Sequence, residues 1–171
     1  MYKALLFIAV MTMFSNMKAQ INQVVFDTIA EKDILIGECN REGLMLPVFA
    51  EFYTLEYGSY SPDQTVVSML ASHGTDYHIV IVMGSWCGDS KEQVPRFLKI
   101  ADSIGLSEAD IRIICVDKKK TAPGLEDELA LDAIQLVPTF MFFSGEKEIG
   151  RIVETPVETL EKDWLKILEK L

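Results

Sequence analysis

The chain has 171 residues, 49% of them hydrophobic and 25% charged, which suits one globular domain and excludes a disordered chain. Its 16 basic and 26 acidic residues give a net charge of −10, the wrong sign for binding nucleic acid or an anionic membrane surface. Three cysteines and two histidines make up neither a disulfide framework nor a zinc site. We expect no nucleic-acid partner, no metal and no cofactor.

Residues 1–20 have the pattern of a secretory signal peptide. Lys3 precedes an uncharged apolar run from Ala4 to Phe14, which is too short for a membrane span of about 20 residues but suits the core of a signal. Cleavage after Ala19 would leave a mature chain without a membrane span, exported to the periplasm or another extracytoplasmic compartment. An uncleaved membrane anchor is the alternative.

Residues 21–74 are expected to form a helical N-terminal extension. Residues 21–29 fit either a short strand or an irregular lead-in, whereas apolar residues recur at helical spacing from Glu31 to Gly58. The stretch SPDQ at 61–64 has the pattern of a capping box with proline at the first helical position. It predicts a helix that starts from Ser61 as N-cap and ends at Gly74.

Residues 75–171 are expected to form one α/β domain, with a central mixed β-sheet flanked by helices. The run YHIVIVMG at 77–84 is continuously apolar and rich in β-branched residues, which is typical of a strand buried on both faces. A strand, a helix and a second strand in this order predict two parallel strands joined by a right-handed crossover. The expected strands are 77–84, 111–117, 138–143 and 148–154, and the expected helices are 93–105, 124–134 and one opened by a capping box at 155–158.

The stretch GSWCGDSKEQVP, residues 84–95, places Cys87 where a strand gives way to a helix. Unpaired backbone N–H groups and the helix dipole at such a start favour thiolate over thiol, and thiolate is the species that attacks a disulfide. Ser90, one turn along, is placed to donate its hydroxyl to the sulfur. The carboxylate of Asp89 works against this, because it disfavours a second negative charge beside it.

The features of residues 75–171 resemble those of the thioredoxin superfamily, in the family's order. The residues that carry the resemblance are Trp86, Cys87, Lys91, Pro95, Asp117, Val137, Pro138 and Thr139. The resemblance implies a thioredoxin-like fold. It also implies a monothiol C-x-x-S active site (WCGDS), because Ser90 stands where the family's second cysteine would be.

The resemblance also implies the shape of a substrate groove. In the family the proline of the Val-Pro-Thr segment is cis and lies across from the cysteine. Pro138 would therefore hold the backbone of Val137 beside Cys87, where a client chain can hydrogen-bond as an added strand. Trp86, Val137, Pro138 and Thr139 would contact the substrate. The alternative for the proline is an ordinary trans bond at the first residue of a strand.

Ser90 limits what such a site can do. A lone Cys87 can form a mixed disulfide with a client protein or a small-molecule disulfide, but release needs the client's own thiol or an external thiol reductant. Thiol–disulfide exchange of this kind, as isomerase or thiol transfer with Cys87 and Ser90 as catalytic residues, is the leading hypothesis. Two further departures from the family are Ile81, where thioredoxins often keep a buried acid, and the unrecognisable first strand and helix.

Several alternatives stay open. A non-catalytic thioredoxin-fold module that binds extended peptides is the main competing function, and peroxide reduction fits less well. Cys115 fits a small apolar core residue, whereas Cys39 is either structural or a distant resolving thiol. The lysines at 118–120 follow a strand whose end lies on the Cys87 edge of the sheet. They form either a solvated loop or a site that attracts acidic clients.

Overall fold

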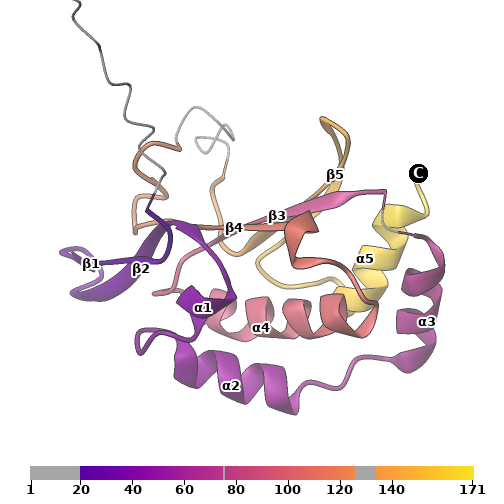
Figure 1. The fold of residues 1–171 in the computed structure, drawn as a ribbon, viewed down its shortest axis with the longest axis horizontal. Coiled ribbons are helices and arrows are strands. Elements are labelled where there is room, and N and C mark those ends of the chain that lie inside the picture. The colour runs from indigo at the N-terminus through magenta and orange to yellow at the C-terminus, as the bar shows by residue number, and fades with distance from the viewer. Residues whose placement is uncertain (1–19, 75, 126–133) are drawn as a thin grey trace, which may run out of the picture.

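The computed structural model describes residues 20–74, 76–125 and 134–171, which fold as strands and helices around one sheet (Figure 1). The strands are β1 (Gln23–Asp27), β2 (Lys32–Cys39), β3 (His78–Met83), β4 (Ile111–Cys115), β5 (Thr139–Ser144) and β6 (Lys147–Val153). The helices are α1 (Arg41–Leu44), α2 (Ala50–Ser59), α3 (Gln64–Ser72), α4 (Gly88–Ser103) and α5 (Leu160–Leu168), with a 3-10 turn at Glu108–Asp110.

The sheet is mixed, with the order β1-β2-β4-β3-β5-β6. β3 and β4 run parallel and are joined through α4, whereas all other neighbours pair antiparallel. Ile81 in the centre of β3 lies opposite Ile113 on one side and Phe140 on the other. The expected α/β thioredoxin-like fold, with helices flanking a central mixed sheet, is therefore confirmed.

Residues of β3 alternate between two cores, because successive side chains of a strand point to opposite faces. Ile79, Ile81 and Met83 belong to the larger core, which the helices cover. Val80 and Val82 belong to a smaller core on the other face. Figure 1 shows α4 between the sheet and α2, in agreement with the packing of α2 on α4. Both faces of β3 are thus buried, as its unbroken apolar sequence predicts.

Stacked aromatic rings join the helices to the sheet in the larger core. The ring of Phe97 on α4 lies 4.4 Å from that of Phe140 on β5 and 4.5 Å from that of Trp164 on α5, centroid to centroid. All three side chains are completely buried, and such pairs add about 0.5–1.5 kcal/mol each beyond the area they bury. This stack holds α4, the helix that begins after Cys87, firmly against the sheet.

The expected helical extension is wrong for its first part. Residues 23–39 form the antiparallel hairpin β1–β2, and β2 pairs with β4 as a member of the central sheet. Ile34, Leu35 and Ile36 are nearly inaccessible there, and Leu35 packs into the larger core. Helix begins only after Asn40, whose side-chain oxygen accepts a hydrogen bond from the Gly43 N–H. The apolar spacing of this segment fits helix and strand alike, and pairing with β4 selects the strand.

Two expected helix starts are also wrong. α3 is capped by Asp63, whose carboxylate accepts hydrogen bonds from the N–H groups of Thr65 and Val66, and not by Ser61. α5 begins after Thr159 rather than at the stretch 155–158. In both places a second capping residue follows the expected one, and the later residue has the extended backbone of an N-cap. The expected helix at 124–134 lies mostly outside the described residues.

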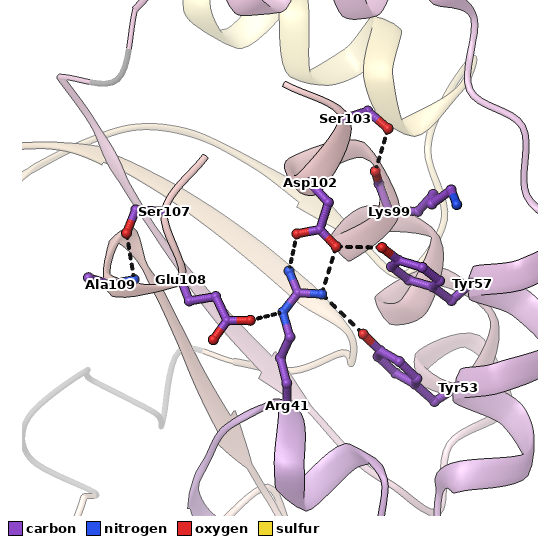
Figure 2. A network of polar contacts seen from close by, with 9 residues as sticks. All are labelled: Arg41, Tyr53, Tyr57, Lys99, Asp102, Ser103, Ser107, Glu108 and Ala109. Carbon is purple, nitrogen blue, oxygen red and sulfur yellow. Dashed lines mark hydrogen bonds and ion pairs between the residues drawn. The ribbon is translucent and has the colours of Figure 1, made fainter. Parts of the chain in front are cut away.

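A network around Arg41 ties the N-terminal helices to α4 (Figure 2). The Arg41 guanidinium binds Asp102 with two hydrogen bonds of 2.6 and 2.9 Å and contacts Glu108 at 2.8 Å and the Tyr53 hydroxyl at 3.1 Å. Tyr57 donates to Asp102 at 2.6 Å, and this bond raises the pKa of Tyr57 to about 12. The network joins α1, α2, the C-terminal end of α4 and the 3-10 turn.

Candidate functional site

Cys87 is the N-cap of α4, just after the carboxyl end of β3, and its side chain is half-buried. Its backbone N–H donates to the Gly84 carbonyl at 2.8 Å, and its own carbonyl accepts from the Lys91 N–H at 3.1 Å. The thiol makes no capping bond to the helix. The sulfur is therefore held at a helix start, with the unpaired N–H groups of the first turn beneath it.

The Val137–Pro138 peptide bond is cis, as expected, and it lies against Cys87. The Cys87 thiol donates to the Val137 carbonyl, with 3.1 Å between sulfur and oxygen. The Pro138 carbonyl accepts from the N–H of Glu154, the residue after β6, at 2.7 Å, and this bond helps to hold the segment in place. Thr139 opens β5, and its hydroxyl donates to the Leu136 carbonyl at 2.8 Å. Residues fifty positions apart in the chain thus meet at one sulfur atom.

Trp86 lies across the edge of the sheet beside Cys87. Its indole N–H donates to the Val116 carbonyl at 2.9 Å, and a Cβ added to Gly84 would lie 2.5 Å from the indole ring. Only glycine therefore fits beneath the ring. The half-buried side chains of Trp86 and Cys87 both pack against the smaller core. Trp86 forms part of the surface around the sulfur and does not fill the core.

Ser90 is completely buried and faces the turn before Cys87. Its hydroxyl oxygen accepts a hydrogen bond from the Gly84 N–H at 3.2 Å, which satisfies a backbone donor that would otherwise be buried without a partner. Among the described residues, no hydrogen bond joins the Ser90 hydroxyl to the Cys87 sulfur. The contact that the structure shows for Ser90 is thus one that shapes the turn.

Lys91 brings positive charge close to the sulfur. Its ammonium group lies 3.8 Å from the centroid of the Phe52 ring on α2. Burial lowers the pKa of Lys91 below its ordinary value, and the positive charge of Lys32 lowers it further, whereas Cys87 and Glu51 act in the opposite direction. Lys32 and Phe52 are site neighbours that sequence reasoning missed. No motif surrounds either residue, and only the fold brings them to α4.

The other two cysteines lie on the opposite face of the sheet. Cys39 on β2 and Cys115 on β4 are buried side chains of the larger core, at diagonal positions of neighbouring strands. All three cysteines are free thiols. A hydrogen bond to Cys39, followed by burial, raises the pKa of Cys115 well above its ordinary value. The sheet separates this pair from Cys87.

The described part of the chain offers no group of three or more His, Cys, Asp or Glu side chains that would hold a metal ion. Within the same ranges, no helix has the length and apolar character needed to cross a membrane.

The fold and this geometry agree with a comparison of the sequence with protein families. The family model described as Thioredoxin matches residues 54–164, which is more than half of the chain. The protein therefore belongs to the thioredoxin family. The match begins within α2, so the residues before α2, β1 and β2 among them, lie outside it.

Solved structures with similar folds include a protein of unknown function from Pseudomonas aeruginosa, 20% identical, with a TM-score of 0.45 over 71% of this chain and 80% of that one. They also include an HIV epitope scaffold, 21% identical, with a TM-score of 0.42 over 71% of this chain and 72% of that one. No curated protein matches the chain. The family assignment therefore depends on the family model and the topology.

Proposed function

We propose that this protein exchanges thiols and disulfides through a mixed disulfide at Cys87, acting as an isomerase or in thiol transfer from a monothiol C-x-x-S site. The observation that carries the proposal is the position of the Cys87 sulfur, half-buried at the start of α4 and 3.1 Å from the Val137 carbonyl before Pro138. An extended client chain that lies along Val137 presents its disulfide to the sulfur.

The exchange takes two steps. In the first, Cys87 thiolate attacks one sulfur of the client disulfide, a new S–S bond forms, and the client's other sulfur leaves as thiolate and takes up a proton. In the second, a thiolate attacks the mixed disulfide and frees Cys87. If that thiolate belongs to the client, the client is isomerised with no net change of electrons. If it belongs to an external thiol reductant, that reductant supplies the electrons.

We further propose that the exchange takes place outside the cytoplasm, in the periplasm or an equivalent compartment. The signal-peptide pattern of residues 1–20 supports this, and disulfides form and persist in such compartments. Expression of the full chain, followed by fractionation and N-terminal sequencing, tests it. We expect a product that starts near Gln20 in the exported fraction, and an intact N-terminus in the cytoplasm would contradict the proposal.

The competing function is a peptide-binding module without chemistry. It is favoured by the hydrogen bond from the Cys87 thiol to the Val137 carbonyl, because a thiol held in this bond lines the groove as a polar group and needs no disulfide to do so. Under this alternative Cys87→Ser leaves the affinity for clients unchanged. Under the proposal it removes all covalent capture.

Trapping distinguishes the two functions. The purified protein is mixed with a peptide that contains one internal disulfide, thiols are quenched with acid and alkylating reagent, and covalent adducts are identified by mass spectrometry. The wild type is expected to accumulate a mixed disulfide at Cys87, and Cys87→Ser none. Ser90→Cys, the matched variant, should accumulate less, because its second thiol releases the client. A wild type with no more adduct than Cys87→Ser would overturn the proposal.

A further inference from the structure

Positive side chains gather around Cys87 in a chain whose net charge is −10. The ammonium groups of Lys118 and Lys120 lie 4.2 and 5.4 Å from the centroid of the Trp86 ring, and Trp86 is the residue before Cys87. Lys91 lies one turn along α4 from Cys87, and its backbone N–H donates to the Cys87 carbonyl. We call Lys91, Lys118 and Lys120 the cationic rim. They come from α4 and from the loop after β4.

Well-defined contacts hold the loop that carries Lys118 and Lys120. The Asp117 carboxylate accepts hydrogen bonds from the N–H groups of Lys119 and Thr121 and from the Thr121 hydroxyl, at 2.8–2.9 Å. On the other side, the Asp27 carboxylate accepts from the Lys118 N–H at 3.2 Å. The carboxylates of Asp27, at the end of β1, and of Asp117, just after β4, therefore fix the loop. The side chains of Lys118 and Lys120 extend from it over Trp86.

Carboxylates also lie near the cationic rim. Asp27 and Asp117 accept N–H groups of the loop, Asp89 lies in the first turn of α4, and Glu51 lies near Lys91. Among the described residues, none of the three rim lysines forms an ion pair with any of them. What distinguishes the lysines is their position, because the ammonium groups of Lys118 and Lys120 lie over the ring of Trp86, beside Cys87.

We propose that this site selects anionic substrates: disulfides that carry carboxylates within a residue or two of the reacting sulfur. This rests on the proposed function of Cys87. A single unit charge several ångströms away in water changes an encounter or an affinity by about twofold to threefold, and the contributions of neighbouring lysines add. Because the rest of the surface is acidic, it repels such a substrate from other orientations, and the cationic rim directs the substrate to Cys87.

Alkylation of Cys87 tests the charge selection without any need for disulfide exchange. Iodoacetate is an anion and iodoacetamide is neutral, and both alkylate the same thiolate. The ratio of their rate constants at Cys87, followed by mass spectrometry, is compared for the wild type, for Lys118→Gln with Lys120→Gln, and for Lys147→Gln. Lys147 is the control, since it is the first residue of β6 and pairs with Ser144, at the opposite end of β5 from Thr139.

We expect the double variant to lower the iodoacetate-to-iodoacetamide ratio by about fourfold to ninefold, as two charges at this distance predict. Lys147→Gln should leave the ratio unchanged. At 0.5 M NaCl the wild type and the double variant should converge, because salt screens charges over a few ångströms at such concentrations. A ratio that is equal in the wild type and the double variant at low salt would overturn the inference.

Mixed-disulfide formation then identifies the source of the carboxylates. Three substrates are compared: a peptide disulfide flanked by glutamates, the same peptide flanked by lysines, and a low-mass disulfide with a carboxylate on each half. A preference for the glutamate peptide indicates acidic client segments, and a preference for the low-mass disulfide indicates a small anionic thiol as partner. Equal or faster reaction of the lysine peptide refutes the charge selection. If none of the three reacts, the proposed exchange fails, while the alkylation ratio still decides the charge selection.

Discussion

Cys87 and Cys115 lie at the carboxyl ends of the neighbouring parallel strands β3 and β4, yet their surroundings have nothing in common. Cys87 follows β3 at the start of a helix, half-buried and in contact with the Val137 carbonyl. Cys115 ends β4 with its side chain completely buried in the larger core beside Cys39. Cys115 points from β4 into the larger core, whereas Cys87 lies beyond the end of β3 and packs against the smaller core on the other face.

Under the proposed function, the backbone around a cysteine, and not the residue itself, decides which thiol reacts. The turn into α4 leaves the Cys87 thiol partly open to solvent. At Cys115, burial and the hydrogen bond with Cys39 favour the neutral thiol and raise its pKa. Cys115 is thus a packing residue, and Cys87 is the thiol for which we propose chemistry. Four experiments test this difference between the two thiols, and they are given from the largest expected effect to the smallest.

The largest effect should be in thiol labelling of the native protein. With 5,5′-dithiobis(2-nitrobenzoate) at neutral pH, Cys87 should react at least about 10³ times faster than Cys39 or Cys115, because buried thiols react only after an opening that costs several kcal/mol. Peptide mapping of the labelled protein checks which thiol reacted. In denaturant all three should react at similar rates. Comparable labelling rates for Cys87 and Cys115 in the native protein would contradict this difference between the two thiols.

Gly84→Ala should damage the Cys87 side specifically. The new methyl group would meet the indole of Trp86 at 2.5 Å, so the ring must move and its hydrogen bond to Val116 breaks. We expect a loss of about 1–3 kcal/mol in unfolding free energy, typical of overpacking, together with slower mixed-disulfide formation. Gly58→Ala on α2 is the control, since nothing lies within 4 Å of its added Cβ, and it should be neutral or stabilising. Urea unfolding measures both.

Alanine at each cysteine should separate stability from chemistry. Cys115→Ala removes a buried sulfur and should cost about 1–2 kcal/mol of unfolding free energy while retaining mixed-disulfide formation. Cys87→Ala should cost less than about 0.5 kcal/mol, as for other partly exposed side chains, while abolishing that reaction. Denaturant unfolding and the trapping assay give the two values. A catalytic loss in Cys115→Ala at full stability would show that the buried thiol takes part.

The smallest effect concerns pH. The folded state raises the pKa of Cys115 above its ordinary value of 9.0. The contribution of this thiol to the unfolding free energy is therefore complete below pH 9.0, and it is lost as the pH rises above 9.0. Between pH 8 and 9.5 the wild type should lose about 0.8 kcal/mol from this thiol. Over the same interval, the unfolding free energy of Cys115→Ala should fall by about 0.8 kcal/mol less than that of the wild type. Unfolding in reductant at both pH values checks it, and equal slopes would mean that the two states share one pKa.

Sequence reasoning was most successful where the pattern is local. The unbroken run of β3 and the change from strand to helix around Cys87 were predicted close to where they lie, because a buried strand and a helix pattern are both readable within a few residues. It failed for β2, whose apolar spacing fits helix as well as strand. It also placed the N-caps of α3 and α5 too early, because two capping residues compete within four positions.

The amino-acid sequence was enough to predict a thioredoxin-like fold with Cys87 at the start of a helix, since both depend on short stretches of chain. The resemblance already placed Val137 beside Cys87, but only the tertiary structure shows that its carbonyl accepts from the thiol, that the Ser90 hydroxyl binds the Gly84 N–H and that Lys118 lies over Trp86. Most of these contacts join segments 30 or more residues apart in the chain. Their geometry depends on how the strands pair, and no local pattern of residues encodes that pairing.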